Sequence, residues 1–344
     1  REDDRFVSLF YRSALANKIV LDMEISEQTK EKDNEKAAAQ KLESNINNLN
    51  AELSEREKIV YGYKTALQNL LEFIRTSGLP EESSELDTLL SNVNEAGNAL
   101  PLEIKDQIQY EELTENKLKN AEDGAANFVS SIILSLAHVN DDELIAQIEE
   151  LKNKREEIKN KINAYETKIN ELKSLLEGFQ YYFNNPSYKE RTGIYSQSGS
   201  ASKNLQKVMD LTREKYQDNI IFVSIHHNAT NAAVQTSASG MYTFFRNNSP
   251  STNTNYYKNY NVEKRQRLAS LLLLETNKST NFSKKQTTPV NADYSVLMEN
   301  NLVSTLVEVG FMNNPNDLKQ IVQDSVREDV AYGLLKGIIA YFNN

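Results

Sequence analysis

Apolar residues recur at alternating steps of four and three along two long stretches of the chain. The first series runs from Leu42 to Ile74 and the second from Leu144 to Phe179, with charged and amide residues filling the positions between. This heptad spacing predicts two long helices that pair through their apolar seams. Each seam contains an arginine, Arg56 or Arg155. Antiparallel pairing within the chain would bury the aliphatic positions while both guanidinium groups reach solvent.

The segment between the two series, residues 77 to 140, follows a different pattern. Gly78 and Pro80 in "SGLP" end the first helix, and short amphipathic stretches follow, with an apolar stretch at 125–139. We therefore expect residues 21–187 to form an antiparallel coiled-coil arm with a small helical tip at about 77–140. His138 lies on the apolar stretch with no other ligand type clustered near it, which favours a partly buried helix histidine over a metal ligand.

Short apolar runs alternate with helical stretches from residue 188 to residue 344. The first run has little polar alternation, which is typical of a strand buried on both faces. Strands that alternate with helices predict an α/β domain with a mostly parallel, twisted sheet flanked by helices. Residues 1–20 and 188–344 would form this domain together, interrupted by the all-α arm. The predicted strands are "NIIFVSIHH", "GMYTFFRNN", "YSVLME" and "LVSTLVEVGF", and the predicted helices lie at about 203–216, 262–277 and 322–342.

Charge and composition exclude several classes of protein. The net charge is -10, and the basic residues interleave with acidic ones, which argues against binding to nucleic acid. No stretch approaches the roughly 18 apolar residues that span a bilayer, so we expect no membrane span. The chain has no cysteine, which excludes disulfides and thiolate metal sites. With three histidines, His138, His226 and His227, it can build few transition-metal sites.

Two chemically active side chains fall at the ends of predicted strands. His226 ends the strand "NIIFVSIHH", and Glu308 lies toward the end of "LVSTLVEVGF". Ligands of such sheets bind at the carboxyl ends of the strands, so we expect these two side chains at one edge. Imidazole can hold a metal ion that acidifies a water molecule, and a nearby carboxylate can take the proton. The pair is thus a candidate site for metal-assisted hydrolysis, although strand-end residues are more often structural or simply exposed.

Three segments resemble one known family. "IIFVSIHHNA", "STLVEVGFMNNPNDLKQI" and "REDDRFVSLFYRSALANK" are similar, in the family's order, to segments of the zinc-dependent N-acetylmuramoyl-L-alanine amidases called amidase 3. The resemblance covers about residues 1–20 and 190–344, and the arm has no counterpart in the minimal family domain. It implies peptidoglycan as substrate and cleavage of the amide between N-acetylmuramic acid and the L-alanine of the stem peptide. It also implies a bacterial protein that is secreted or located in the cell envelope.

The resemblance assigns roles to individual residues. His226 falls on a zinc-ligand histidine, and Glu308 falls on the catalytic glutamate, a general base toward water and then an acid toward the leaving amine. Asn228 matches a strand-end asparagine that contacts substrate or shapes the site. His227 stands where the family has a small residue, and neighbours on a strand point to opposite faces. We therefore expect His227 to be exposed or to support the site indirectly, not to share a metal ion with His226.

The first segment receives structural roles. Arg1, Asp4, Arg5 and Arg12 match the family pattern at the start of the domain. Arg12 would lie, together with Asn17, on a helix that packs on the sheet beside the site. Further along the chain, Gly310 and residues 313–317 match the turn and helix start that follow the catalytic strand, where "NNPND" supplies capping and turn residues.

The resemblance does not extend to a complete metal site. The family's first zinc histidine, in a "DPGHGG" turn, and a glutamate ligand both precede the segment that begins here at Arg1. His226 alone cannot hold zinc in a closed tetrahedral shell. We expect the 344-residue chain to be a zinc-poor, inactive fragment of a longer amidase, with an unpaired sheet edge that promotes association. The alternative is a scaffolding protein that has lost zinc chemistry and works through its arm.

The arm itself has two interpretations that the sequence does not separate. One is a rigid spacer or a rod for self-association, and the other is a binding arm for a regulatory protein. Because the arm is inserted between the first segment and the histidine strand, movement at its base would also reposition His226.

Overall fold

The computed structural model describes residues 8–190, 192–195, 202–211, 214–231, 234–247, 261–283, 286–300 and 302–343. The chain forms two compact units, which we call the sheet unit, Arg1–Glu31 with Tyr165–Asn344, and the arm unit, Lys32–Ala164. Two long helices, α1 (Leu9–Ser77) and α6 (Asp142–Glu177), contribute to both units. The predicted boundaries near residues 20 and 187 stay a prediction. No helix in the described ranges combines the length and apolar character needed to cross a membrane.

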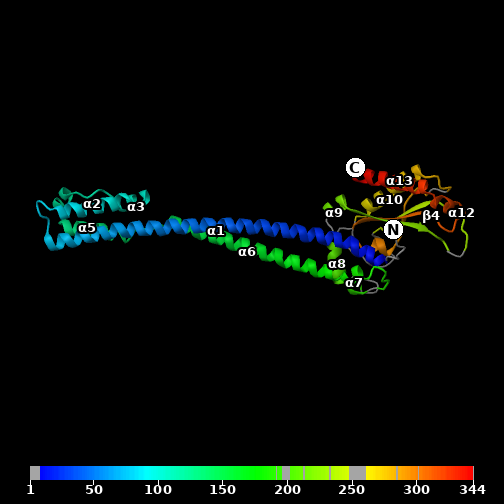
Figure 1. Cartoon of the computed structure of the whole chain (residues 1–344), viewed down its shortest axis with the longest axis horizontal. Helices are drawn as coiled ribbons and strands as arrows, with labels where there is room; N and C mark the ends of the chain where they lie inside the picture. The colour runs from blue at the N-terminus through cyan, green and yellow to red at the C-terminus, as the bar shows by residue number, and fades with distance from the viewer. Residues whose placement is uncertain are drawn as a thin grey trace. The chain divides into compact units, whose positions relative to one another are not determined.

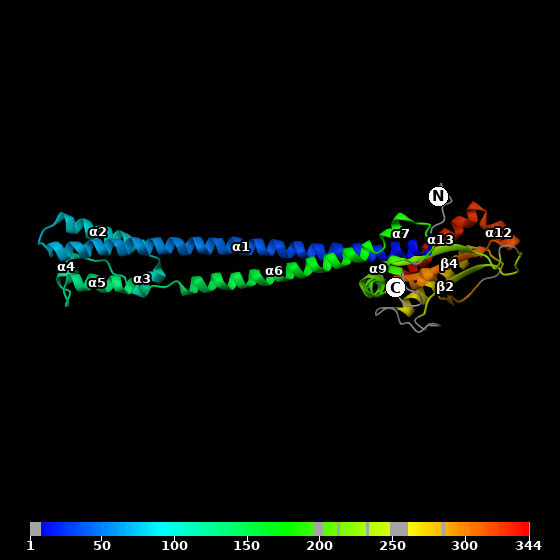
Figure 2. The same ribbon diagram turned by 90° about the horizontal axis from the view of Figure 1, so that it is seen from below.

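In the arm unit, α1 and α6 run side by side in opposite directions (Figures 1 and 2). Arg56 of α1 pairs with Asp141 just before α6, at 3.1 Å, whereas Glu43 pairs with Arg155 further along α6. Residues further along α1 pair with residues earlier along the α6 side, so the two helices are antiparallel. Ile46 is buried against α6, as the apolar seam predicts.

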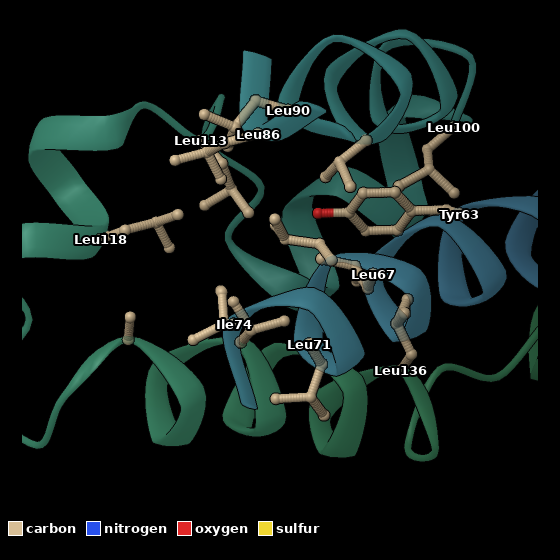
Figure 3. Close-up of a cluster of buried hydrophobic side chains, with 14 of the residues drawn as sticks. Tyr63, Leu67, Leu71, Ile74, Leu86, Leu90, Leu100, Leu113, Leu118 and Leu136 are labelled. Atoms are coloured by element: carbon tan, nitrogen blue, oxygen red, sulfur yellow. The ribbon is translucent and has the colours of Figure 1, made fainter. Parts of the chain in front are cut away.

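Four short helices surround the end of α1 to form the tip (Figure 2). Gly78 has a φ of +72°, a left-handed conformation that suits glycine and ends α1. Ser83 then caps α2, because its hydroxyl accepts a hydrogen bond from the backbone N–H of Leu86 at 3.2 Å. Tyr63 and Leu67 of α1 lie at the centre of the tip core, surrounded by leucines of the other helices (Figure 3). The short helices are α2 (Ser84–Asn98), α3 (Leu102–Ile108), α4 (Glu115–Lys119) and α5 (Ala125–Leu136).

The sheet unit contains a four-stranded mixed sheet in the order β1-β4-β2-β3. The pairs β1–β4 and β2–β3 are parallel, and β2–β4 is antiparallel. The α/β fold class with a long helical region is confirmed. The strands are β1 (Ile221–Asn228), β2 (Met241–Phe245), β3 (Val290–Asn291) and β4 (Val303–Phe311).

Helices cover both faces of this sheet. On one face, α10 (Val262–Ser279) and α13 (Asp324–Phe342) pack together and bury the alternate β4 residues Val303, Val307 and Val309 (Figure 1). On the other face, α11 (Ser295–Met298) packs on Leu306, and the beginning of α1 packs nearby. The remaining elements are α7 (Gln180–Asn184), η1 (Gly193–Tyr195), α8 (Lys203–Asp210), α9 (Glu214–Asn219) and α12 (Pro315–Ile321).

Four local expectations are wrong. His138, expected as a partly buried helix histidine, is exposed and lies in the turn after α5. "YSVLME" contains the helix α11 instead of a strand, because Val296 and Leu297, neighbours in sequence, are both buried, and a strand with one buried face would alternate. The helix expected at 203–216 is divided into α8 and α9. Strand β1 is not buried on both faces: it forms one end of the described sheet, and Ile225 is 57% exposed. Full burial belongs instead to the central strand β4.

A bulge near the end of β4 shifts its register with β1. His226 pairs with Glu308, but Asn228 pairs with Phe311, so two β4 residues face one β1 residue. Gly310 has a φ of +68°, and a Cβ there would lie 2.9 Å from the Phe282 ring and 3.0 Å from Ile321. A glycine is therefore required by both backbone and packing.

We predict that Gly310→Ala destabilises the sheet unit by about 1–3 kcal/mol, because the left-handed backbone and the crowded Cβ are both unfavourable. Gly62→Ala is the matched control: Gly62 lies inside α1 with open space around it, so alanine should stabilise the helix by about 0.5–1 kcal/mol. Urea unfolding followed by circular dichroism measures both changes. Equal stability of Gly310→Ala and the parent chain would show that the bulge is not constrained.

Candidate active site

The register of β1 and β4 places the two predicted site residues side by side. His226 and Glu308 are direct partners in the parallel pair, and Tyr242 of β2 is the partner of Glu308 on its other side. Directly opposed residues on neighbouring strands project from the same face. This face also carries Leu306. It is the face opposite to the one on which the β4 valines pack against α10 and α13. An imidazole, a carboxylate and a phenol thus form one row across the sheet.

His227 is separated from this row. It follows His226 on the strand, lies at the bulge and is exposed. Its Nδ1 lies 2.7 Å from the carbonyl oxygen of Val309, to which it donates a hydrogen bond. With Nδ1 engaged in this way, His227 anchors the bulge.

His226 is in direct contact with Arg12 of α1. The Arg12 Nη1 lies 2.5 Å from Nε2 of His226, and the Ser224 hydroxyl lies 3.1 Å from the same nitrogen. Because a guanidinium group can only donate, Nε2 accepts this hydrogen bond through its lone pair. Burial, followed by the charges of Arg12 and His227, lowers the pKa of His226. The imidazole is therefore neutral, and Arg12 has a closer relation to the site than the purely structural role predicted for it.

Glu308 is a half-buried carboxyl group on the central strand. Burial raises its pKa to about 7, and its Oε2 is sealed from solvent with no hydrogen-bond partner among the described residues. The phenol of Tyr294, just before α11, has a raised pKa. Burial is the larger cause, and the charge of the nearby Glu308 is the second. A carboxyl group with a pKa near neutrality can both take and return a proton under physiological conditions.

Asn228 participates in the loop that borders the row. Its Oδ1 accepts a hydrogen bond from the backbone N–H of Ala229 at 2.8 Å, and its carbonyl oxygen accepts one from Met312 at 2.7 Å. Asn313 continues the same network, because its amide donates to the carbonyl oxygens of Asn231 and Val234 at 2.7 and 2.8 Å. These bonds fix the loop after β1 to the turn after β4.

The turn after β4 and the first helix are anchored by buried polar groups. Asn314 caps α12, as "NNPND" predicts, by accepting from the backbone of Asn316 and Asp317. The buried Asp317 carboxylate accepts from the backbone N–H groups of Gly240 and Phe311, both at 2.9 Å.

On α1, the Asn17 amide donates to the carbonyl oxygen of Glu299 at 2.8 Å. This bond ties the helix that carries Arg12 to the sheet unit. Three residues assigned by resemblance lie outside the described ranges: Arg1, Asp4 and Arg5.

The described residues do not complete a metal site. They include no group of three or more histidine or carboxylate side chains that could hold an ion, whereas zinc takes at least three protein ligands. The Nε2 lone pair of His226 is already used by Arg12. A metal ion here would need ligands from outside the described ranges and either displacement of Arg12 or coordination through Nδ1.

We predict that Glu308→Gln makes the sheet unit more stable than the parent chain at pH 8 but not at pH 4. Because the pKa of Glu308 is higher in the folded parent chain than the 4.5 of the unfolded chain, folding favours the protonated carboxyl group. The stability that this group contributes to the parent chain is fully present below pH 4.5 and is lost as the pH rises through about 7. Because the group is only half-buried and solvent screens its charge, the difference is about 1–2 kcal/mol.

Urea unfolding of both chains at the two pH values measures this difference. Glu328→Gln, which replaces an exposed carboxylate on α13, is the matched control. A pH-independent effect of Glu308→Gln would mean that the carboxyl group is not desolvated.

Comparison with known proteins gives a family for this part of the chain. Residues 177–340 match the model of the family described as N-acetylmuramoyl-L-alanine amidase. The match does not include residues 1–20. Among curated proteins, no match to the chain is found.

Solved amidase structures also align with the chain, with low TM-scores. One is an N-acetylmuramoyl-L-alanine amidase from Clostridium difficile 630, with 19% identity and a TM-score of 0.31 over 51% of this chain and 84% of that one. Another is Ami1 from Mycobacterium smegmatis, with 14% identity and a TM-score of 0.31 over 51% and 76%. A third is the catalytic domain of CwlV from Bacillus (Paenibacillus) polymyxa var. colistinus, with 15% identity and a TM-score of 0.30 over 51% and 84%. Over residues 177–340, the chain is therefore similar to the N-acetylmuramoyl-L-alanine amidase family.

Proposed function

We propose that this domain hydrolyses the amide between N-acetylmuramic acid and the L-alanine of the peptidoglycan stem peptide. The observation that carries the proposal is the direct pairing of His226 with Glu308, in a domain that matches the amidase family. The pairing brings an imidazole beside a carboxyl group whose pKa is about 7. This combination suits proton transfer during amide hydrolysis.

Glu308 acts twice in this reaction. As a carboxylate it takes a proton from the water that attacks the amide carbonyl carbon, and as a carboxylic acid it then gives that proton to the departing nitrogen of L-alanine. Amines leave as neutral groups only when protonated, so the second transfer completes cleavage of the carbon–nitrogen bond.

We propose roles for three further residues around the row. Arg12 holds the His226 ring through Nε2, and Asn228 shapes the adjoining loop, where a polymer strand could contact its side chain. His227 positions the bulge through Val309 and contacts no reacting atom.

Zinc enters this proposal through the family resemblance. When bound, it would lower the pKa of a coordinated water molecule. His226 is the residue that would hold it, together with ligands from outside the described ranges. The proton transfers assigned to Glu308 do not depend on which residues those are. With one imidazole in the row, the 344-residue chain should bind zinc weakly and be inactive.

We propose that the protein acts on the cell wall of a bacterium, as a secreted or envelope protein. A second candidate function is partner binding through the arm unit, in which the sheet unit serves as an anchor. Two features of the tip favour this function: its excess of negative charge and a cavity between its helices.

We predict that Glu308→Gln reduces hydrolysis by about 10²–10⁴-fold, because glutamine cannot carry the proton. The measurement is release of stem peptides with a free L-alanine amino group from peptidoglycan, by mass spectrometry, on the protein as its gene encodes it and saturated with zinc. Glu328→Gln should retain full activity. Equal activity of the two variants would exclude Glu308 as the proton carrier, and release of sugar fragments with new reducing ends would replace the amidase reaction by glycoside hydrolysis.

We predict that the 344-residue chain retains well below one zinc ion per chain after dialysis, and that His226→Ala lowers even this amount. His227→Ala is the matched control and should leave it unchanged, because His227 is directed to the bulge. Metal analysis of the three dialysed chains measures the content. One zinc ion per chain, lost in His226→Ala, would show that the chain contains a complete ligand set after all.

A further inference from the structure

The tip carries almost all of the net charge of the protein. Residues 77–140 contain twelve Asp and Glu against three Lys and no Arg, a net charge of -9 (3 minus 12), whereas the whole chain has -10. In this part of the chain, all of which is described, lysines pair with Glu111 and Glu115 and with no other carboxylate. Most of the acidic side chains are exposed. The tip therefore presents a strongly negative surface.

A cavity of about 370 Å³ opens between α1, α5 and the segment after α3. This volume lies within the range of ligand pockets, about 300–1,000 Å³. Its walls include the aromatic rings of Tyr63, Tyr110 and Phe128, together with Leu113 and Ile132. Its polar lining consists of Gln109, Glu111, Lys117, Ser131 and Ser135, and Lys117 pairs with Glu111. A cavity with both aromatic and polar walls thus lies within the negative surface.

Tyr63 gives this cavity an unused hydrogen-bonding group. The side chain lines the cavity and is 1% exposed, yet its hydroxyl has no hydrogen-bond partner among the residues that the structure describes. Its ring meets the Tyr110 ring edge-on, with centroids 5.9 Å apart. Burial raises the pKa of the Tyr63 phenol, so the group remains a donor. No described residue accepts a hydrogen bond from this hydroxyl, so a carbonyl oxygen bound in the cavity could accept one.

The walls of the cavity are held in place before any partner binds. The Asn94 side chain makes two hydrogen bonds to the backbone of Leu113, each 2.8 Å long. The Tyr110 hydroxyl donates to the side-chain oxygen of Asn98 at 3.2 Å. A Cβ on Gly97 would lie 2.3 Å from the Tyr110 ring, so glycine makes room for it. Such preorganisation lowers the entropic cost of binding.

We propose that the tip is a docking site for a basic protein segment that inserts one large apolar side chain into this cavity, with a backbone carbonyl accepting a hydrogen bond from Tyr63. Aromatic cavities that receive one anchor are typical centres of binding energy in interfaces. The surrounding carboxylates select a cationic partner and steer it to the cavity. A tip-to-tip contact between two copies is disfavoured, because two tips of -9 repel each other.

The experiment uses a synthetic peptide, acetyl-Lys-Lys-Trp-Lys-Lys-amide, titrated with the full chain. Because the protein has no tryptophan, peptide fluorescence reports the complex alone. We expect a blue shift of the Trp emission, a rise in anisotropy, and weaker binding as sodium chloride increases. Replacing the peptide Trp by Ser, or its four Lys by Glu, should abolish binding.

Variants of the tip locate the site. Tyr63→Phe should weaken binding about fivefold, as expected for one lost hydrogen bond, and leave thermal unfolding unchanged, because the hydroxyl has no partner to lose. Tyr61→Phe, at a 72% exposed position two residues away, is the matched control and should bind like the parent. Phe128→Ala, which removes a cavity wall, should weaken binding by more than tenfold.

Several outcomes would overturn the proposal. Equal affinities of Tyr63→Phe and Tyr61→Phe would place the peptide elsewhere, and equal binding of the Ser peptide would reduce the interaction to charge alone. Binding of the Glu peptide would show that the partner need not be cationic. Self-association of the chain that is abolished by Phe128→Ala would assign the cavity to a second copy.

Discussion

The register of the parallel pair β1–β4 is the constraint on which the site depends. It runs without a break from Ile221↔Val303 to His226↔Glu308, and because side chains alternate along a strand, a slip of one residue would send His226 to the opposite face. Two features keep the register in place. The alternate valines of β4 are buried against α10 and α13, and the bulge at Gly310 ends the regular pairing directly after the site. The bulge also gives neighbouring histidines different tasks: His226 enters the row, while His227 is fastened to Val309.

Desolvation then determines what the row can do. Glu308 lies on the most completely buried strand, so its carboxylate loses hydration on folding. No described side chain compensates for this loss by a hydrogen bond to Oε2. Arg12 could have stabilised the carboxylate, but its guanidinium is engaged with His226 instead. A salt bridge to Glu308 would have lowered its pKa and left a poor proton carrier. The uncompensated burial suits general acid–base chemistry.

Several features could be predicted from the sequence because they follow from short-range patterns. The strand that ends in His226, the strand that carries Glu308 and the cap at Asn314 belong to this group. Other features depend on contacts between distant residues. "YSVLME" is apolar enough for a strand, but tertiary packing of Val296 and Leu297 makes it a helix. The contact of Arg12 with His226 joins residues 214 positions apart, and no local pattern encodes it. The exposure of Ile225 is set by the place of β1 in the sheet order.

The two seams of the arm show the same division between local pattern and distant contact. Heptad spacing alone predicted long helices, while the ion pairs Arg56–Asp141 and Glu43–Arg155 fix their direction and alignment. The Glu43–Arg155 pair is exposed and the Arg56–Asp141 pair is partly buried, and ion pairs that retain contact with water add little stability. The buried residues of α1 and α6 must therefore hold the hairpin together, and the charges select the register. At the tip, the leucine core determines the shape, and the excess of carboxylates contributes nothing to that packing. Unpaired negative charge on a well-packed body influences which molecules approach it and how fast, so the arrangement of these carboxylates is a matter of recognition and solubility rather than of folding.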